Sequence, residues 1–260
     1  MTLPSRLCLR LAIVKRIKGV GRCAMKFKYE DNGIQRIRFE ELPSTNDYAK
    51  EKRGEKQPLI VTALRQSKGR GTKGRSFVSN EGGVYLSLLR FYDNFPAKEG
   101  FKIMANAAVA VCETLRHFGL SPVIKWANDV FVDDKKICGI LIENTFSGAF
   151  VQSSVVGVGL NVNGSFEGEL KEIATSMQER TGKTFSVEEL TERLIAELLK
   201  ERKMQDYLDY IGYLGREVLL ILGERTTRGK LISVDEEGGL LVEIDGEQKR
   251  LTSAEVSIRI

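Results

Sequence analysis

Residues 59–91 read LIVTALRQSKGRGTKGRSFVSNEGGVYLSLLRF, a glycine-rich basic loop between two apolar runs. The runs 59–64 and 84–91 are rich in branched and aromatic side chains, which predicts two buried strands. The loop matches the spacing of a dinucleotide-binding fingerprint and differs by one residue type from a P-loop. Both motifs need a helix directly after the glycines, because the helix N-terminus holds the phosphates. A second strand follows here instead, which excludes both nucleotide-binding motifs.

The loop is also unusually basic. Arg65, Lys68, Arg70, Lys73 and Arg75 lie within eleven residues that contain no acid. Glycine lets a backbone approach an anion closely, and Lys and Arg neutralise carboxylates and phosphates. Because the cations repel one another, we expect a mobile flap that closes over a phosphate-bearing ligand. A solvated basic turn is the alternative.

Outside this unit, the apolar pattern predicts further short strands and three helices. Strands are expected at 34–40, 123–126, 129–132, 136–143 and 151–158, with a hairpin turn at 133–135. Helices are expected at 47–52, after a turn and N-cap at 43–46, and at 102–118. Ser186 and Glu189 form an S-x-x-E pattern that opens another helix.

From residue 215 onward the sequence predicts strands alone. They are expected at 217–222, 227–234, 239–244, 248–252 and 256–260, joined by tight turns. Short strands joined in this way are typical of a small β-barrel. We therefore predict a basic N-terminal arm over 1–26, a domain of the α/β (α+β) class over 27–214, and a small β-barrel domain over 215–260.

Composition excludes several classes of protein. The 260 residues are 42% hydrophobic and 29% charged, which is typical of a globular protein with a core. The longest apolar run, 107–112, is far shorter than the ~20 residues that span a bilayer. The single histidine, His117, excludes a zinc site built from two or three histidines. Because His117 lies near the end of a predicted helix, we expect it to be structural.

Four cysteines, Cys8, Cys23, Cys112 and Cys138, show no paired spacing. They predict neither a disulfide framework nor a zinc knuckle. Sparse thiols suit a reducing compartment, and we expect the protein to be cytoplasmic.

The positive charge is concentrated at the N-terminus. The net charge is +5, yet residues 1–24 hold six basic residues and no acid, which leaves −1 for the rest. A chain that is nearly neutral beyond one arm is not expected to coat nucleic acid. We interpret the arm as disordered, or as lying upstream of a true start at Met25. A transit-like or nucleic-acid-touching segment is the alternative.

Two more clusters combine polar groups with strand ends. Residues 125–129 read KWAND and bring together a lysine, the only tryptophan, an amide and a carboxylate. Neighbouring Asn and Asp suit Mg²⁺ bound with ATP, because hard cations take oxygen ligands; a turn beside a core tryptophan is the alternative. Residues 157–163 read GVGLNVN, for which a strand-end bulge is the alternative interpretation.

Five motifs occur in order along the chain: Ser44-Thr45-Asn46, Gln66 with Gly69-Arg70-Gly71, KWAND at 125–129, KICGILIE at 136–143, and GVGLN at 157–161. Together they closely resemble the biotin protein ligases, from about residue 39 to the C-terminus. The resemblance implies a class II synthetase-like biotin/lipoate ligase core, with a mixed sheet flanked by helices, and a C-terminal SH3-like barrel. It implies that biotin and MgATP form biotinyl-5′-AMP, which a carrier-protein lysine then attacks, without any catalytic histidine.

The resemblance also implies roles for the motif residues. Biotin would contact Ser44, Thr45, Asn46, Gln66, Gly69, Arg70, Gly71, Thr72, Lys136 and Gly139. Lys136 would bridge the biotin carboxylate and the α-phosphate. Lys136 and Arg70 would be the catalytic residues. ATP or the adenylate would contact Trp126, Asn128, Asp129, Asn161 and Arg259, with Asn128 and Asp129 also serving Mg²⁺.

The sequence departs from the family pattern at two positions. Ala127 stands where proline is usual, which leaves the backbone before Asn128 less constrained. Thr72 stands where arginine is common, which puts retention of the adenylate in doubt. Some members also carry an N-terminal helix-turn-helix of about 60 residues. Only 38 residues precede Phe39, so we expect a ligase without repressor function.

A lipoate or octanoate ligase and, from another class, a biotin-responsive DNA-binding regulator are the alternatives. The S-T-N and KWAND motifs favour biotin, and the near-neutral charge beyond the arm disfavours DNA binding. The expected partners are biotin, ATP and the biotin carboxyl carrier protein of acetyl-CoA carboxylase or a related carboxylase. We expect neither nucleic acid nor membrane as a partner, and either a monomer or a homodimer.

Overall fold

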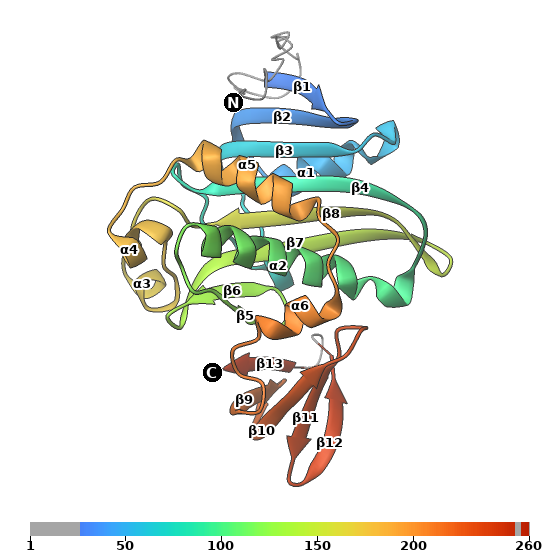
Figure 1. Cartoon of the computed structure of the whole chain (residues 1–260), viewed down its shortest axis with the longest axis vertical. Coiled ribbons are helices and arrows are strands. Elements are labelled where there is room, and N and C mark those ends of the chain that lie inside the picture. Colours follow the sequence, from blue (N-terminus) through green and yellow to red (C-terminus); the bar gives the residue numbers. More distant parts are fainter. Residues whose placement is uncertain (1–26, 253–255, 260) are drawn as a thin grey trace, which may run out of the picture.

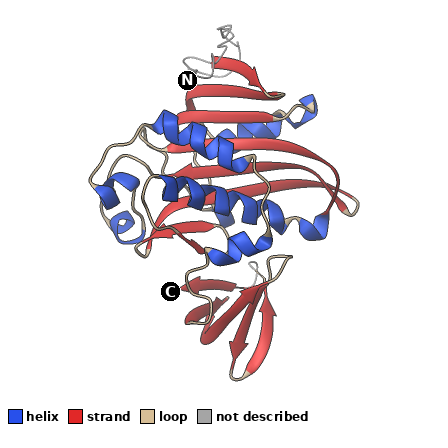
Figure 2. Ribbon diagram, in the orientation of Figure 1, coloured by secondary structure: helices blue, strands red, loops and turns tan. Residues whose placement is uncertain are grey.

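The computed structural model describes residues 27–252 and 256–259, so the arm predicted over 1–26 lies outside the described part. The described residues form a large sheet with helices on both faces and a smaller sheet at one end of the molecule (Figure 1). Figure 2 shows both sheets, with the helices gathered on the larger one. The predicted fold class, a mixed sheet flanked by helices with a strand-only C-terminal part, is confirmed.

The large sheet has eight strands in the order β1-β2-β3-β4-β8-β7-β6-β5. They are β1 (Phe27–Asp31), β2 (Ile34–Leu42), β3 (Leu59–Gln66), β4 (Val84–Pro96), β5 (Val123–Lys125), β6 (Asp129–Val132), β7 (Lys135–Ser147) and β8 (Phe150–Leu160). Among the strand pairs that the described residues form in this sheet, only β2 and β3 run parallel. A parallel pair needs a crossover, and α1 (Thr45–Glu51) with the 3-10 turn η1 (Arg53–Glu55) provides it.

The helices divide the large sheet into two unequal faces. The 3-10 turn η3 (Ala97–Glu99) leads into α2 (Phe101–His117), which lies with α5 (Val187–Leu198) on one face, whereas α1 lies on the other (Figure 1). Alternate residues of β8 follow this division. Val156 and Val158 belong to the large core with α2, and Val155 belongs to a smaller core with Ala49 of α1.

Several elements differ from the sequence prediction. β7 and β8 extend beyond 143 and before 151, because their pairing continues to the hairpin at Gly148. The sequence did not predict β1, α3 (Glu169–Ile173), α4 (Met177–Thr181) or α6 (Met204–Asp209). Helices of five or six residues offer too little periodicity to detect. Ser186 caps α5 as predicted, accepting a hydrogen bond from the Glu189 backbone amide (3.2 Å).

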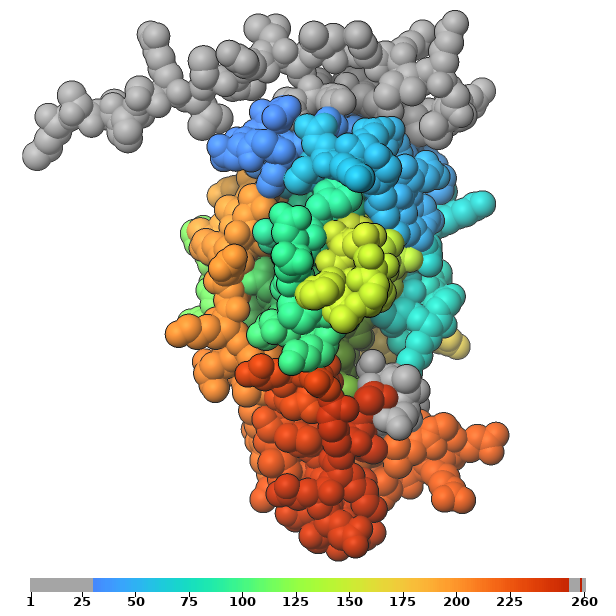
Figure 3. All heavy atoms as spheres, turned by 90° about the vertical axis from the view of Figure 1, so that its right-hand side faces the viewer, coloured from blue at the N-terminus to red at the C-terminus, as the bar shows by residue number. Residues whose placement is uncertain are grey.

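The smaller sheet is antiparallel, with five strands in the order β12-β11-β10-β9-β13. They are β9 (Glu217–Leu222), β10 (Arg225–Val234), β11 (Leu240–Ile244), β12 (Glu247–Leu251) and β13 (Val256–Arg259). Figure 3 shows this sheet as a lobe at one end of the molecule. Its buried Leu220, Leu231 and Val242 belong to the same apolar cluster as Ala108 of α2, so the two sheets share a core.

The single histidine and the described cysteines lie in helix α2 and strand β7. His117 is the last residue of α2, and its ring stands edge-on to Phe118 (5.1 Å between centroids). Cys112 and Cys138 are buried free thiols, and burial raises the pKa of each. Cys8 and Cys23 lie outside the described residues. Across residues 27–252 and 256–259, no helix has the length and apolar character needed to cross a membrane.

Candidate active site

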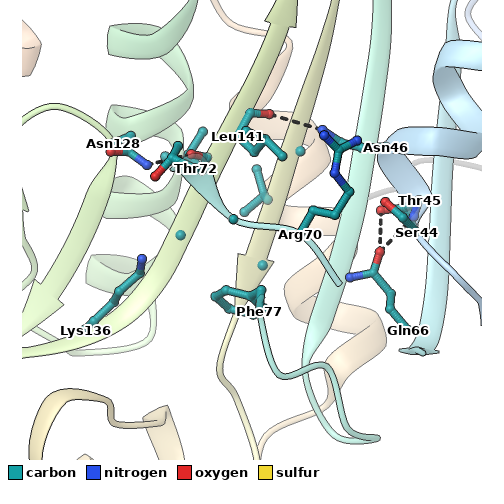
Figure 4. A pocket seen from close by; sticks show the side chains of 16 residues that line it. Ser44, Thr45, Asn46, Gln66, Arg70, Thr72, Phe77, Asn128, Lys136 and Leu141 are labelled. Carbon is teal, nitrogen blue, oxygen red and sulfur yellow. Dashed lines mark hydrogen bonds between the residues drawn. The ribbon is translucent and has the colours of Figure 1, made fainter. Parts of the chain in front are cut away.

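A pocket lies on the α1 face of the large sheet, between α1, the loop after β3, and strands β7 and β8 (Figure 4). Its lining includes residues from all five motifs: Ser44, Thr45, Asn46, Gln66, Arg70, Gly71, Asn128, Lys136, Gly139, Ile140, Leu141, Gly157, Val158 and Gly159. Thr72 and Phe77 complete it. The fold therefore brings together motifs that are dispersed over more than a hundred residues of sequence.

Hydroxyl and amide side chains make one end of the pocket polar. The Ser44 hydroxyl caps α1 by accepting a hydrogen bond from the Asp47 backbone amide (3.3 Å). This places Thr45 and Asn46, both buried, in the first turn of the helix. Gln66 is the last residue of β3, and its Oε1 accepts from the Thr45 backbone amide (2.7 Å) and hydroxyl (3.1 Å). Gln66 Nε2 donates to Ser79 (3.0 Å). One hydrogen of the Gln66 amide is left over for a ligand.

Asn46 is held from three sides. The hydroxyl of Ser87 in β4 donates to Asn46 Oδ1 (2.6 Å). Asn46 Nδ2 donates to the Leu141 carbonyl (3.4 Å) and to the Glu143 carboxylate (3.1 Å). These contacts use both amide hydrogens and one lone pair of the oxygen. Asn46 therefore offers a ligand a single acceptor position.

Glycines in β7 and β8 form the floor of the pocket. A Cβ at Gly157 would lie 2.1 Å from Asn46 Oδ1, and one at Gly159 would lie 2.6 Å from the Phe77 ring. A Cβ at Gly139 would also crowd Phe77, at 3.2 Å. Strand pairing continues in register through Gly157 and Gly159, so the alternative interpretation of a strand-end bulge is wrong.

The opposite end of the pocket carries a cation. Figure 4 shows Lys136 and Gln66 on opposite sides. Lys136 Nζ lies 2.7 Å from Asp129 Oδ1, across the β6–β7 pair, and a Cβ at Gly139 would come within 3.2 Å of the same ammonium group. Asn128 Nδ2 donates to the Ile140 carbonyl (2.9 Å), so its side-chain oxygen remains an acceptor. The hairpin turn between β6 and β7, at 133–134, agrees with the prediction.

The loop between β3 and β4 lies over the pocket and contains the 3-10 turn η2 (Thr72–Gly74). Gly71 N donates to the Arg75 carbonyl (2.7 Å). A Cβ at Gly69 would lie 2.3 Å from the Phe77 carbonyl oxygen, which explains the glycine there. The expected repulsion does not apply to Arg70, because it contacts the carboxylates of Asp47 (2.6 Å) and Glu143 (3.4 Å).

The comparisons with known proteins agree with this geometry. Residues 39–161 match the Biotin/lipoate A/B protein ligase family, and residues 213–259 match the Biotin protein ligase C terminal domain. The Bifunctional ligase/repressor BirA of Bacillus subtilis is 32% identical over 250 residues, covering 89% of this chain and 76% of that protein. The chain belongs to the biotin protein ligase family.

Other members of the ligase family are similar over comparable lengths. BirA of Escherichia coli is 31% identical over 235 residues, covering 84% of this chain and 72% of that protein. The structure of the Aquifex aeolicus biotin protein ligase in complex with biotin and ATP superposes with a TM-score of 0.69. It is 32% identical in sequence and covers 86% of this chain and 98% of that one.

Three residues that the ligase resemblance assigns to ATP or the adenylate do not line the pocket: Trp126, Asp129 and Asn161. Trp126 is buried, directly follows β5, and is joined to Ala127 by a cis peptide bond. Its Nε1 donates to the Gly238 carbonyl next to the smaller sheet's β11 (3.1 Å). Asn161 Nδ2 donates to the Thr175 carbonyl (3.0 Å). The Arg259 backbone pairs with β9, and its side chain lies outside the description. Their contacts with nucleotide stay predictions.

The sequence reasoning missed four residues of this ligase site: Phe77, Ser87, Asp47 and Glu143. Phe77 packs over Gly159, and the other three contact residues that line the pocket. Ser87 had a usable signal, since a serine inside the apolar run 84–91 needs a buried hydrogen-bond partner. Glu143 lies in the quoted motif at 136–143, but neither it nor Asp47 had a signal for its partners, because these are set by the fold.

Proposed function

We propose that this protein uses ATP to join biotin to a lysine of a biotin carboxyl carrier protein, that of acetyl-CoA carboxylase or a related carboxylase, through biotinyl-5′-AMP. The observation that carries the proposal is the order of groups across the pocket. Hydrogen-bonding side chains lie at one end, glycines and Phe77 in the middle, and Lys136 at the other end (Figure 4). Relatives named for this chemistry support it, including a Biotin–[acetyl-CoA-carboxylase] ligase of Paracoccus denitrificans that is 28% identical.

Biotin has the same order of groups as the pocket. Its ureido ring carries N–H donors and a carbonyl acceptor, its thioether ring and side chain are apolar, and its carboxylate is an anion. The free acceptor on Asn46 and the free hydrogen on Gln66 complement the ureido group. The narrow glycine floor admits the rings, and the carboxylate reaches the Lys136 end.

Lipoate fits the polar end less well. Its dithiolane ring offers no strong donor or acceptor to Asn46 and Gln66, whose remaining hydrogen-bonding positions would stay unpaired. A site built to hydrogen-bond its substrate rejects an analogue that lacks those groups by a factor of about 10⁴–10⁵. We therefore propose biotin rather than lipoate or octanoate as the substrate.

In the proposed first step, a biotin carboxylate oxygen attacks the α-phosphorus of ATP and the bond to pyrophosphate breaks. Lys136 exchanges Asp129 for the two converging anions and stabilises the charge between them. Asn128 and Asp129 would each offer a side-chain oxygen to Mg²⁺ held mainly by the phosphates, and Asp129 becomes available for this role when Lys136 turns to the anions. When bound, Mg²⁺ supplies further neutralisation of phosphate charge.

In the proposed second step, the carrier lysine attacks the acyl carbon of the adenylate, and the bond to the AMP oxygen breaks. The amine proton leaves as the amide forms. The chain supplies no nucleophile of its own to this scheme, so its contribution is positioning and charge stabilisation. We propose that the activity is cytoplasmic, in a monomer or homodimer, and that neither nucleic acid nor a membrane takes part.

Pyrophosphate release tests the proposal directly. The protein is incubated with ATP and Mg²⁺ and with biotin, lipoate or octanoate in turn, and then with a carrier domain and labelled biotin. We expect pyrophosphate with biotin only, and label on the carrier. Pyrophosphate with lipoate but not with biotin would overturn the assignment.

A further inference from the structure

Four charged side chains form a closed ring at the rim of the pocket. Arg70 contacts Asp47 (2.6 Å), Asp47 contacts Lys50 (2.7 Å), Lys50 contacts Glu143 (2.9 Å), and Glu143 contacts Arg70 (3.4 Å). Positive and negative groups alternate, so the ring has no net charge. Two members belong to α1, one to the loop over the pocket and one to β7, so the ring joins three separate elements.

We propose that Glu143 is a positioning residue, which sets the orientation of the Asn46 amide and anchors the loop arginine through the same carboxylate. This rests on the proposed function, because it assigns a role in holding biotin and its adenylate. Glu143 does not line the pocket itself, whereas Asn46 and Arg70 both do. It therefore acts through them.

The two oxygens of Glu143 have different partners. Oε2 accepts from Asn46 Nδ2 (3.1 Å), and Oε1 accepts from Lys50 (2.9 Å) and lies within 3.4 Å of Arg70. The backbone carbonyl of Glu143 accepts from Arg53 (2.6 Å), which fixes the strand at this point. Hydrogen bonds to a carboxylate are about twice as strong as neutral ones. This side chain therefore decides which end of the Asn46 amide faces the pocket.

The orientation of Asn46 matters because its two ends have opposite hydrogen-bonding character. With Nδ2 held by Glu143, the oxygen lies beside Ser87 and presents an acceptor to the ureido N–H of biotin. A flipped amide would turn two donors toward that N–H. Gly157 leaves room for this amide, since a Cβ there would lie 2.1 Å from Oδ1 and 2.9 Å from Nδ2.

Asp47 provides a matched comparison for Glu143. It contacts the same two cations, and the pKa of each carboxyl is held below its ordinary value, because hydrogen bonds and charge outweigh the effect of partial burial. Among the described residues, no hydrogen bond joins the Asp47 side chain to Asn46. Neutralising Asp47 weakens the ring alone, whereas truncating Glu143 also releases Asn46.

Biotin binding by titration calorimetry and escape of preformed labelled adenylate test the inference. The variants are Glu143→Ala, Asn46→Ala, the double variant that combines these two, Glu143→Gln and Asp47→Asn. Glu41→Gln is the control, since Glu41 pairs with Arg65 (2.8 Å) outside the pocket. Wild-type protein that binds no biotin would refute the proposed function itself, and that result is read separately from the variants.

We expect Glu143→Ala to raise the Kd for biotin about tenfold or more, and to add less than twofold when Asn46 is already alanine. Glu143→Gln, which still accepts from Asn46, and Asp47→Asn should leave the Kd within about threefold while adenylate escape speeds up several-fold. Thermal melts accompany each variant. A Kd within twofold of wild type for Glu143→Ala, or losses that simply multiply in the double variant, would overturn the inference.

Discussion

At the scale of single residues, the pocket depends on its glycines as much as on the side chains that line it. Gly139, Gly157 and Gly159 lie on two adjacent strands, and any Cβ there would meet Phe77 or Asn46. The neighbouring positions that face α2 are apolar and buried. A strand pair therefore serves as core on one face and as a binding floor on the other, because side chains alternate along a strand.

Lys136 is the residue whose loss we expect to cost most activity. Lys136→Ala should slow adenylate formation by more than tenfold, since a charged hydrogen bond lost from such a site typically costs ~2–4 kcal/mol of transition-state stabilisation. Pyrophosphate release measures the effect. Lys135→Ala is the matched control, because Lys135 donates to the Lys171 carbonyl (2.6 Å) and does not line the pocket. Wild-type turnover by Lys136→Ala at unchanged thermal stability would mean that Lys136 is only a solvated hairpin lysine.

At the scale of elements, the loop over the pocket is held at its base rather than along its length. Isolated bridges join Gln66 to Ser79 and Arg70 to Ser76, while η2 between them has no buried residue. Loops with few buried contacts open at low free-energy cost. We expect trypsin to cut the ligand-free protein after Lys73 or Arg75, and biotin with ATP to slow this cleavage several-fold.

Mass spectrometry of the fragments checks the prediction on the loop, and cleavage elsewhere in the chain provides the internal control. Arg70→Gly should increase cutting in the free protein, because it removes the contacts to Asp47 and Glu143. The same variant should release its adenylate faster, and free adenylate would then acylate bystander lysines. Equal cutting with and without ligand would show that the loop is not gated by ligand.

The end of α5 is joined to α2 by a buried carboxylate. Glu197 is 3% exposed and contacts Arg193 (2.7 Å), Lys200 (2.8 Å) and Arg202 (2.7 Å). Arg202 in turn reaches Asn106 of α2 (3.5 Å). Although burial acts to raise it, the hydrogen bond from Lys200 and the surrounding cations lower the pKa of Glu197 below the ordinary 4.5.

A carboxylate with a lowered pKa stabilises the fold fully above its ordinary pKa and loses that contribution as pH falls through the lowered value. Glu197→Gln should therefore cost about 3 kcal/mol of unfolding free energy at pH 7, because it leaves the buried Arg202 charge without its carboxylate partner. The cost should shrink below about pH 4. Urea unfolding at both pH values measures it.

Glu188→Gln is the control for Glu197, since Glu188 is exposed and 3.9 Å from Arg38, and we expect less than about 0.5 kcal/mol from it. Equal costs for the two glutamates, or no dependence on pH, would contradict the assigned role of Glu197.

At the scale of the whole molecule, the two sheets are joined through Trp126. Its indole donates to the Gly238 carbonyl, and Tyr213 contacts the Trp126 backbone amide through its hydroxyl (3.0 Å). Gly238 has a positive φ of 84° and lies against the Phe101 ring, where a Cβ would come within 2.2 Å. With a shared apolar core as well, the two parts are expected to unfold together.

Because Trp126 is the only tryptophan, its fluorescence reports this junction. We expect the thermal transitions followed by fluorescence and by far-ultraviolet circular dichroism to coincide. Trp126→Phe should lower stability by about 1–3 kcal/mol, since the Gly238 carbonyl loses its buried donor. Calorimetry measures this variant. A fluorescence transition well below the dichroism transition would show that the smaller sheet separates first.

The sequence by itself determined most of the strands and the longer helices, and which motifs carry the chemistry. Apolar runs such as 59–64 and caps such as Ser186 act over a few residues, so local patterns are enough to predict them. The five motifs were also sufficient for the family. The role of Phe77 and the short helices were not predicted, because a single aromatic ring or one helical turn leaves no periodic pattern in the sequence.

Only the tertiary structure decided the partners of the charged and amide groups. Asn46 and Glu143 are 97 residues apart, and Trp126 and Gly238 are 112 apart. These contacts exist because β8 lies between β4 and β7, and because Gly238, next to β11 of the smaller sheet, lies against Phe101 of α2. Hydrogen bonds and ion pairs act over about 3–4 Å, and the separation of two residues along the sequence does not predict whether they come that close in the fold. The ring around Arg70 could therefore be seen only once the sheet order was known.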